Sequence, residues 1–290
     1  MKRLFALLSC ILFLLAGCAS REAPAQIAAT TLPVYEFTSR LCEGTGITVA
    51  RLVTENVSCL HDYSLNVRQT RAAEAAELIV ISGAGLEDFM EDLLLGKSVV
   101  DSSHGIDALH ADHAHDHDHD HDHDHAEDAH IWLSPANAKQ MATNICAGLA
   151  EKYPAHKAAF EANLQTLLAD IDTLAQYAET QLSSLSCRDL ITFHDGFSYL
   201  AEAFDLHILA AVEEESGSEA SAAELKTLIQ LVREHNLPAV FTERSGSVSA
   251  ADVIAAETGV KIHTLDMAMS GDSWLDAMYQ NINTLKEALG

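Results

Sequence analysis

The sequence predicts an α/β fold with two similar lobes, each a mostly parallel sheet flanked by helices, joined by one long helix. Short apolar runs alternate with helical patterns in both halves, as is typical of parallel sheets. Between the halves, residues 154–185 form one long helical pattern without glycine, which can act as a stiff connection. A chain of 290 residues is long enough for two lobes that each have a core.

In the first half, short apolar runs have the length of buried strands, and helical patterns separate them. Pro33 is placed to open the first helix, and Gly83 and Gly85 turn the chain into the third. The expected strands cover residues 26–31, 48–53, 78–82 and 98–101, and the expected helices cover residues 33–41, 66–76 and 86–95.

The second half repeats the alternation after a helix that leads into the long connection. Ser134 and Pro135 are a good N-cap and first residue for a helix to about Lys152, and Gly259 ends a later helix. The expected strands cover residues 190–193, 206–212, 239–242 and 260–265, and the expected helices cover residues 196–204, 220–235, 248–258 and 273–289.

The first residues have the pattern of an export signal. Lys2 and Arg3 precede a short apolar run that is too short to span a bilayer. The sequence Leu-Ala-Gly before Cys18 resembles a bacterial lipobox, which predicts cleavage before Cys18 and attachment of lipid to it. We therefore expect a protein that is lipid-anchored to the outer face of the bacterial cell membrane.

The chain is expected to divide into five segments. They are a signal peptide (1–17), a tether (18–26), an N-terminal lobe (27–152) with a histidine-rich loop (103–128), a linking helix (153–186) and a C-terminal lobe (187–290).

A run of alternating histidine and aspartate occupies residues 110–125. It holds no apolar residue larger than alanine, so it is expected to form a solvated loop rather than a core. Imidazole and carboxylate groups are ligands for borderline divalent metals such as zinc. The run is therefore expected to be an accessory metal-binding loop, with His110, His113, His115, His117, His119, His121, His123 and His125 as ligands.

Charge and cysteine content narrow the possible partners. The chain has 43 acidic and 17 basic residues and a formal net charge of −26, which argues against nucleic acid and anionic lipid and suits a protein that attracts cations. After Cys18, the four cysteines Cys42, Cys59, Cys146 and Cys187 allow three disulfide pairings, and free thiols are equally compatible with the sequence. The absence of a C-x-x-C pair makes a thiolate zinc site improbable.

Four single residues are candidate metal ligands because of their places in the predicted fold. His61 follows the second strand, His194 and Asp266 end strands of the second lobe, and His130 lies at a loop-to-helix junction. Ligands of open α/β sheets bind beyond the carboxyl ends of the strands. Taken singly, each residue also has an ordinary structural explanation, as a surface, core or capping residue.

The motifs around these residues resemble one known family over most of the chain. HDYSLNVRQTRAAEAAELIVISGAGLEDF, HIWLSP, ITFHDGFSYLAEAF and FTERSGSVSAADVIAAETGVKIHTLD are similar, in this order, to the zinc- and manganese-binding lipoproteins of bacterial ABC importers. The resemblance implies a monomeric receptor with metal clamped between two lobes, delivering it to an ABC permease and its ATPase. It places the four metal ligands on His61, His130, His194 and Asp266, with Glu243 as a supporting residue or substitute ligand.

The ligand set favours zinc over manganese. Three imidazoles and one carboxylate give zinc a near-tetrahedral shell, whereas manganese prefers more oxygen ligands. Manganese-type members of the family have a carboxylate at the third position, where this chain has His194.

Other functions compete with a zinc receptor. A manganese or broad divalent-metal receptor, and a surface lipoprotein that buffers metal or acts as an adhesin, share most of these features. An exported metallohydrolase is less favoured, because the chain has no H-E-x-x-H or G-x-S-x-G motif, and no enzymatic activity is expected.

Overall fold

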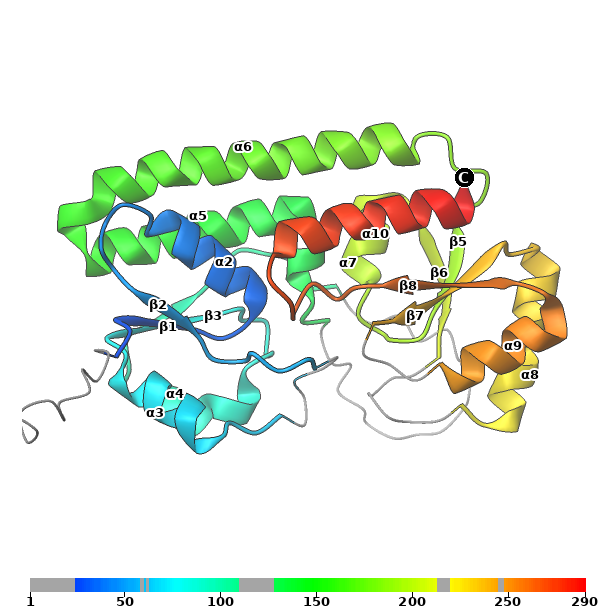
Figure 1. Ribbon diagram of the computed structural model, residues 1–290, viewed down its shortest axis with the longest axis horizontal. Helices are drawn as coiled ribbons and strands as arrows, with labels where there is room; N and C mark the ends of the chain where they lie inside the picture. Colours follow the sequence, from blue (N-terminus) through cyan, green and yellow to red (C-terminus); the bar gives the residue numbers. More distant parts are fainter. Residues whose placement is uncertain (1–23, 58–59, 61–62, 110–127, 213–219, 245–247) are drawn as a thin grey trace, which may run out of the picture.

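The computed structural model describes residues 24–57, 60, 63–109, 128–212, 220–244 and 248–290, which form two parallel sheets connected by a long helix (Figure 1). The signal peptide, Cys18, Cys59, His61 and most of the histidine-rich loop lie outside these residues. Among the helices that are described, none is both long and apolar enough to cross a membrane.

The first sheet has the strand order β2-β1-β3-β4, and its three neighbouring pairs are all parallel. Its central strands are almost completely buried, as expected for a sheet with helices on both faces. Helices α3 and α4 lie on one face, and α2 and α5 on the other (Figure 1). The elements of this half are β1 Ile27–Ala29, α2 Leu32–Leu41, β2 Val49–Arg51, α3 Val67–Ala75, β3 Leu78–Ile81, the 3-10 turn η1 Asp88–Met90, α4 Glu91–Leu94, β4 Val99–Asp101, η2 Ile131–Leu133 and α5 Pro135–Lys152.

The second sheet has the order β6-β5-β7-β8 and is again parallel in every pair. In both sheets the first and third strands are central, so the predicted similarity of the two lobes is confirmed at the level of topology. The elements are β5 Asp189–Thr192, α7 Ser198–Ala203, β6 His207–Ala211, α8 Ala222–His235, β7 Ala239–Glu243, α9 Ser249–Thr258, β8 Lys261–Leu265 and α10 Trp274–Leu289.

The long connection consists of a 3-10 turn, η3 Pro154–His156, followed by the 26-residue helix α6 Lys157–Leu182. Helix α6 runs along one side of the molecule, over both sheets, and packs on α2, α5 and α10 (Figure 1). One cluster of buried apolar residues extends from Ile27 in β1 through Leu167 in α6 to Leu289 in α10. The two sheets therefore share a continuous core beneath α6.

One predicted helix is wrong. Residues 86–95 were expected to form a regular helix, but they form a turn, the 3-10 turn η1 and the four-residue helix α4. At the start of this segment Glu87 turns inward, and its buried carboxylate accepts hydrogen bonds from the backbone N–H groups of Ser82 and Gly83 and from the Thr30 hydroxyl. This inward position leaves Glu87 outside helical geometry, with ψ at 23°.

The described cysteines carry no disulfide. Cys42, Cys146 and Cys187 are free thiols, and the first two are buried. Burial raises the pKa of the Cys42 thiol to about 12, which makes it a poor nucleophile.

Candidate metal centre

His130 is held so that one ring nitrogen remains available to a ligand. It lies at the start of η2 and is 2% exposed. Its Nδ1 lies 2.8 Å from Oδ1 of Asp128, and its backbone N–H donates to the same oxygen at 2.9 Å. A carboxylate only accepts, so Nδ1 carries the hydrogen and Nε2 carries the lone pair. This Nε2 is buried and has no hydrogen-bond partner among the described residues.

The Asp128 carboxylate remains ionised in this environment. Burial raises the pKa of Asp128, but the hydrogen bonds from the ring and backbone of His130, together with electrostatic attraction to that residue, hold the pKa below its usual value. A charged carboxylate behind an imidazole fixes the ring and makes its other nitrogen a stronger metal ligand.

The imidazole rings of His194 and His130 are in contact, with the edge of one directed at the face of the other. His194 follows β5, is 3% exposed, and its ring centroid lies 5.3 Å from that of His130 at an interplanar angle of 89°. Its Nδ1 lies 3.9 Å from Oε2 of the buried Glu243, which ends the neighbouring strand β7. Gly196 makes the approach possible, because a Cβ there would lie 2.8 Å from Cδ2 of His194 and 2.9 Å from Cε1 of His130.

Asp266 follows β8 and is engaged on both carboxylate oxygens. Its Oδ1 accepts the backbone N–H of Ala268, and its Oδ2 lies 2.8 Å from Nε of Arg244. The buried Asn281 holds the Asp266 backbone at both its N–H and its carbonyl. The guanidinium of Arg244 also donates to Oε1 of Gln280 at 3.0 Å. The carboxylate of Asp266 thus forms an ion pair with the guanidinium of Arg244.

Two of the four predicted ligands, His130 and His194, are therefore in contact, and a third, Asp266, is bound to Arg244. His61 and the histidine-rich loop lie outside the described residues. Within the described residues, no group of three or more His, Cys, Asp or Glu side chains is arranged to hold a metal ion. The four-ligand site remains a prediction, and its described part is the histidine pair.

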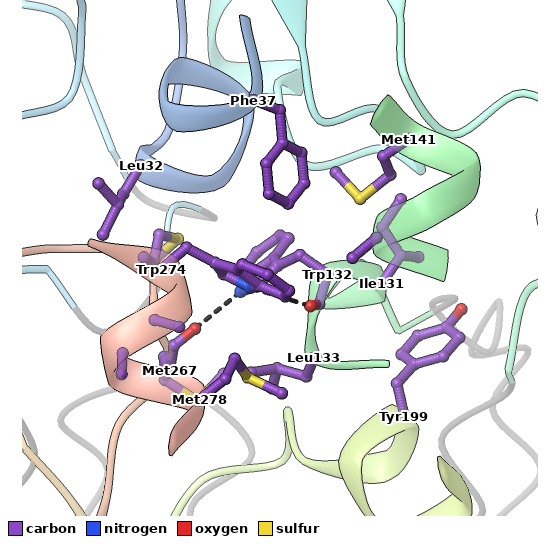
Figure 2. Packing of buried hydrophobic residues seen from close by; sticks show 14 of the residues in the cluster. Leu32, Phe37, Ile131, Trp132, Leu133, Met141, Tyr199, Met267, Trp274 and Met278 are labelled. Atoms are coloured by element: carbon purple, nitrogen blue, oxygen red, sulfur yellow. Dashed lines mark hydrogen bonds between the residues drawn. The ribbon is translucent and has the colours of Figure 1, made fainter. Parts of the chain in front are cut away.

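Two tryptophans connect the segments that carry His130 and Asp266 (Figure 2). The indole Nε1 of Trp132 donates to the carbonyl of Met267 at 2.7 Å, and the indole Nε1 of Trp274 donates to the carbonyl of Trp132 at 3.1 Å. Both rings are fully buried. These bonds fix the loop between β8 and α10 against η2, which comes from the first half of the chain.

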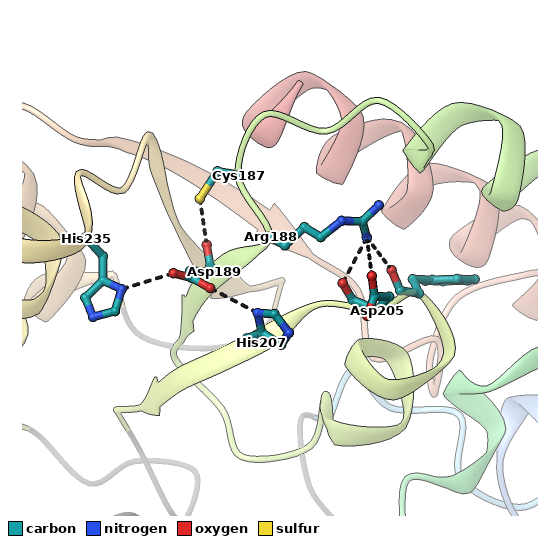
Figure 3. Close-up of polar contacts among 7 residues, drawn as sticks. Cys187, Arg188, Asp189, Asp205, His207 and His235 are labelled. Atoms are coloured by element: carbon teal, nitrogen blue, oxygen red, sulfur yellow. Dashed lines mark hydrogen bonds and ion pairs between the residues drawn. The ribbon is translucent and has the colours of Figure 1, made fainter.

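A second histidine and aspartate cluster lies at the opposite end of β5 (Figure 3). Asp189 begins β5, and its two carboxylate oxygens lie 3.1 Å from Nδ1 of His207 and 3.0 Å from Nδ1 of His235. The hydrogen bond from His235 is the largest effect that lowers the pKa of Asp189. The two histidine side chains are 64% and 38% exposed, so this cluster ties α8 to the sheet at the surface.

Sequence reasoning missed three residues around the histidine pair. Asp128 fixes His130, Gly196 provides space for both rings, and Arg244 binds Asp266. The spacing of Asp128 two residues before His130 is a local signal that could have been found. The role of Gly196 depends on the distant His130, and that of Arg244 on the neighbouring strand β8, so the linear sequence carries no signal for them.

Comparison with known proteins gives a consistent result. The sequence matches the family described as zinc-uptake complex component A, periplasmic (ZnuA), over residues 27–288. It is 30% identical to the high-affinity zinc uptake system protein ZnuA of Bacillus subtilis over 91% of this chain and 87% of that protein. It is 27% identical to the zinc-binding lipoprotein AdcA of Streptococcus pneumoniae strain R6, over 99% of this chain and 61% of that protein.

Solved structures of ZnuA have a similar fold. A crystal structure of ZnuA superimposes with a TM-score of 0.80 at 31% identity, over 92% of this chain and all of that chain. A ZnuA deletion mutant with zinc bound superimposes with a TM-score of 0.78 at 30% identity, over 92% of this chain and 98% of that one.

Proposed function

The chain belongs to the ZnuA family of zinc-uptake proteins, and on this basis we propose that it captures zinc between its two lobes and delivers it to an ABC permease. The family consists of solute-binding receptors of zinc import rather than enzymes. The resemblance inferred from the sequence motifs is confirmed.

The observation that carries the proposal is the buried pair of His130 and His194. Two imidazoles meet at the carboxyl end of the second sheet, and one has its Nε2 free of hydrogen bonds to described residues. Neutral imidazole nitrogen suits zinc. The proposed shell is completed by His61 and by Asp266, with Glu243 behind His194 as a supporting acceptor or substitute ligand.

Zinc binding to the purified protein tests this proposal. Chelator-stripped protein should bind one zinc ion tightly and melt at a higher temperature with zinc, because a ligand of the folded state stabilises by RT ln(1 + [L]/Kd). His130→Ala and His194→Ala should weaken that site, whereas His235→Ala, at the surface cluster, should leave it unchanged. Equal melting temperatures with and without zinc would contradict the proposal.

Zinc is favoured over manganese because of the third ligand position. His194 supplies nitrogen where a carboxylate would supply the oxygen that manganese prefers. Manganese remains the second candidate cargo, and competition between the two metals distinguishes the two proposals.

ZnuA-family proteins act with the permease and ATPase of an ABC importer. We propose in addition that this chain is a monomer attached by lipid at Cys18 to the outer face of the cell membrane. The lipobox-like residues before Cys18 support the attachment. Cys18→Ala should release the protein from membranes, and an unmodified N-terminus elsewhere in the native protein would contradict the anchor.

A further inference from the structure

The carboxylate of Asp266 is held in place by the backbone, whereas its ion-pair partner Arg244 has a long and largely exposed side chain. Reciprocal hydrogen bonds to Asn281 hold the Asp266 backbone, and Ala268 N–H holds Oδ1. The Asp266 side chain is 11% exposed. Of the groups that the described residues place at this carboxylate, the Arg244 guanidinium belongs to a long side chain, which can leave without moving the backbone.

Arg244 has both the freedom and the space to withdraw. Its side chain is 53% exposed, and beyond Asp266 its guanidinium is held by Gln280 Oε1 at 3.0 Å. Both residues line a cavity of about 320 Å³ between β8 and α10, whose walls also include Asp266, Asn283, Thr284 and Glu287. The cavity opens toward solvent, so the displaced guanidinium can be hydrated there.

A metal ion and Arg244 compete for the same anion. A divalent cation on Asp266 would stand within a few ångströms of the guanidinium on Oδ2, and like charges at such a distance repel. An arginine cannot lose its proton to relieve this repulsion. If Asp266 is a ligand, this repulsion favours a metal-bound state in which Arg244 has given up its bond to Oδ2.

We propose that Arg244 is the displaceable counter-ion of the metal site. In the metal-free protein it neutralises Asp266, it withdraws into the cavity when zinc binds, and it returns to the carboxylate as zinc leaves. Arg244 thereby lowers zinc affinity and speeds release, which suits a receptor that must hand over its cargo. This inference rests on the proposed zinc function and names a residue that tunes it.

Zinc affinity and release rate of Arg244 variants test the proposal. Arg244→Gln should tighten zinc binding by about tenfold, comparable to the loss of one competing charge-assisted hydrogen bond. It should also slow zinc release to excess chelator. Arg244→Lys keeps the charge but loses the planar Nε donor, so it should lie between Arg244→Gln and the wild type. Arg233→Gln removes an equal charge from α8 in the same lobe and should change neither quantity.

A double-mutant comparison shows whether Arg244 acts through Asp266. In an Asp266→Asn background, Arg244→Gln should no longer tighten zinc binding. Unchanged or weaker zinc binding in Arg244→Gln, with wild-type melting of the metal-free protein, would overturn the inference. An equal gain in both backgrounds would also overturn it. A wild-type protein that binds no zinc would instead refute the proposed function itself.

Discussion

The indole N–H of Trp132 donates to the main-chain carbonyl of Met267, and so links the residue two places after His130 to the residue directly after Asp266. The two candidate ligands come from different halves of the chain, 136 positions apart in sequence. Together with the bond from Trp274 to the Trp132 carbonyl, the bond from Trp132 to Met267 makes their relative position a property of the folded core rather than of two independent loops.

Trp132→Phe should weaken both the fold and the metal site. The variant leaves the Met267 carbonyl without its donor, which typically lowers the free energy of unfolding by about 1–3 kcal/mol. Denaturant titration measures this loss, and zinc competition should show weaker binding. Trp274→Phe, which loses the bond to the Trp132 carbonyl and keeps the bond to Met267, measures the share of the second indole bond in holding the same loop. Wild-type zinc affinity in Trp132→Phe would contradict the link.

Asp128→Asn should weaken zinc binding by roughly 10- to 100-fold, as is usual when the carboxylate behind a histidine ligand is lost. The amide no longer stabilises the Nδ1–H tautomer of His130 with a full charge. Asp189→Asn changes the same chemical group at the surface cluster, where two histidine Nδ1 atoms also bind a carboxylate. Similar losses in the two variants would show a general electrostatic effect instead of a role at His130.

His194→Glu should shift preference from zinc toward manganese, and His194→Ala should weaken both metals. Glutamate adds a second anion and oxygen ligands, which manganese favours. Competition titrations of both metals on the wild type and the two variants measure the shift. Unchanged zinc affinity in His194→Ala would remove His194 from the site and, with it, the main reason to favour zinc.

Deletion of residues 110–125 should reduce the number of bound zinc ions but keep one tight site. The loop ligands must be ordered when they bind, so each ion is held weakly. Elemental analysis at limiting and at excess zinc separates the two classes. Loss of the tight site on deletion would mean that these histidines, rather than the four single ligands, hold the metal.

Glu87 should make the metal-free protein less stable as the pH rises. Burial raises the pKa of Glu87 to about 7, although hydrogen bonds from Thr30, Ser82 and Gly83 oppose the rise. The folded state therefore binds the proton more tightly than the unfolded state, and stability is lost between about pH 4.5 and 7. The loss is on the order of 3 kcal/mol.

Unfolding free energies at pH 5 and pH 8 test the Glu87 prediction. Glu87→Gln, which cannot ionise, should gain stability relative to the wild type as the pH rises. Glu91→Gln, on the exposed side of α4, controls for the loss of one negative charge. Parallel pH profiles for Glu87→Gln and the wild type would show that Glu87 does not titrate in this range.

The sequence predicts what is locally determined in this fold. Ser134 does cap α5, with its hydroxyl accepting from the N–H of Asn137, and Gly259 ends α9 with a positive φ of 79°. These signals act within a few residues of the chain. The break in the helix predicted at residues 86–95 involves the hydroxyl of Thr30, 57 positions before Glu87, as well as the nearby backbone of Ser82 and Gly83, and periodicity carries no signal for the distant partner.

The same distinction applies to the site. His130 and His194 could be selected because each lies within a recognisable motif, and the structure brings them together. The salt bridge from Arg244 to Asp266 joins residues at the ends of the neighbouring strands β7 and β8. The pairing of these two strands cannot be read from the residues around either one. Sequence therefore nominates candidate metal ligands, whereas tertiary structure shows the partners that these residues contact, such as Arg244 at Asp266.

The continuous apolar core beneath α6 should make the two halves of the protein unfold together. Because Ile27, Leu167 and Leu289 belong to one buried cluster, neither half can separate from the other without exposing the apolar surface that α6 shares with α10. Fragments cut between α6 and β5 should each be unfolded alone and should regain structure only when mixed. Heat should unfold the intact chain in one cooperative transition, with equal calorimetric and van't Hoff enthalpies, although the chain forms two separate sheets.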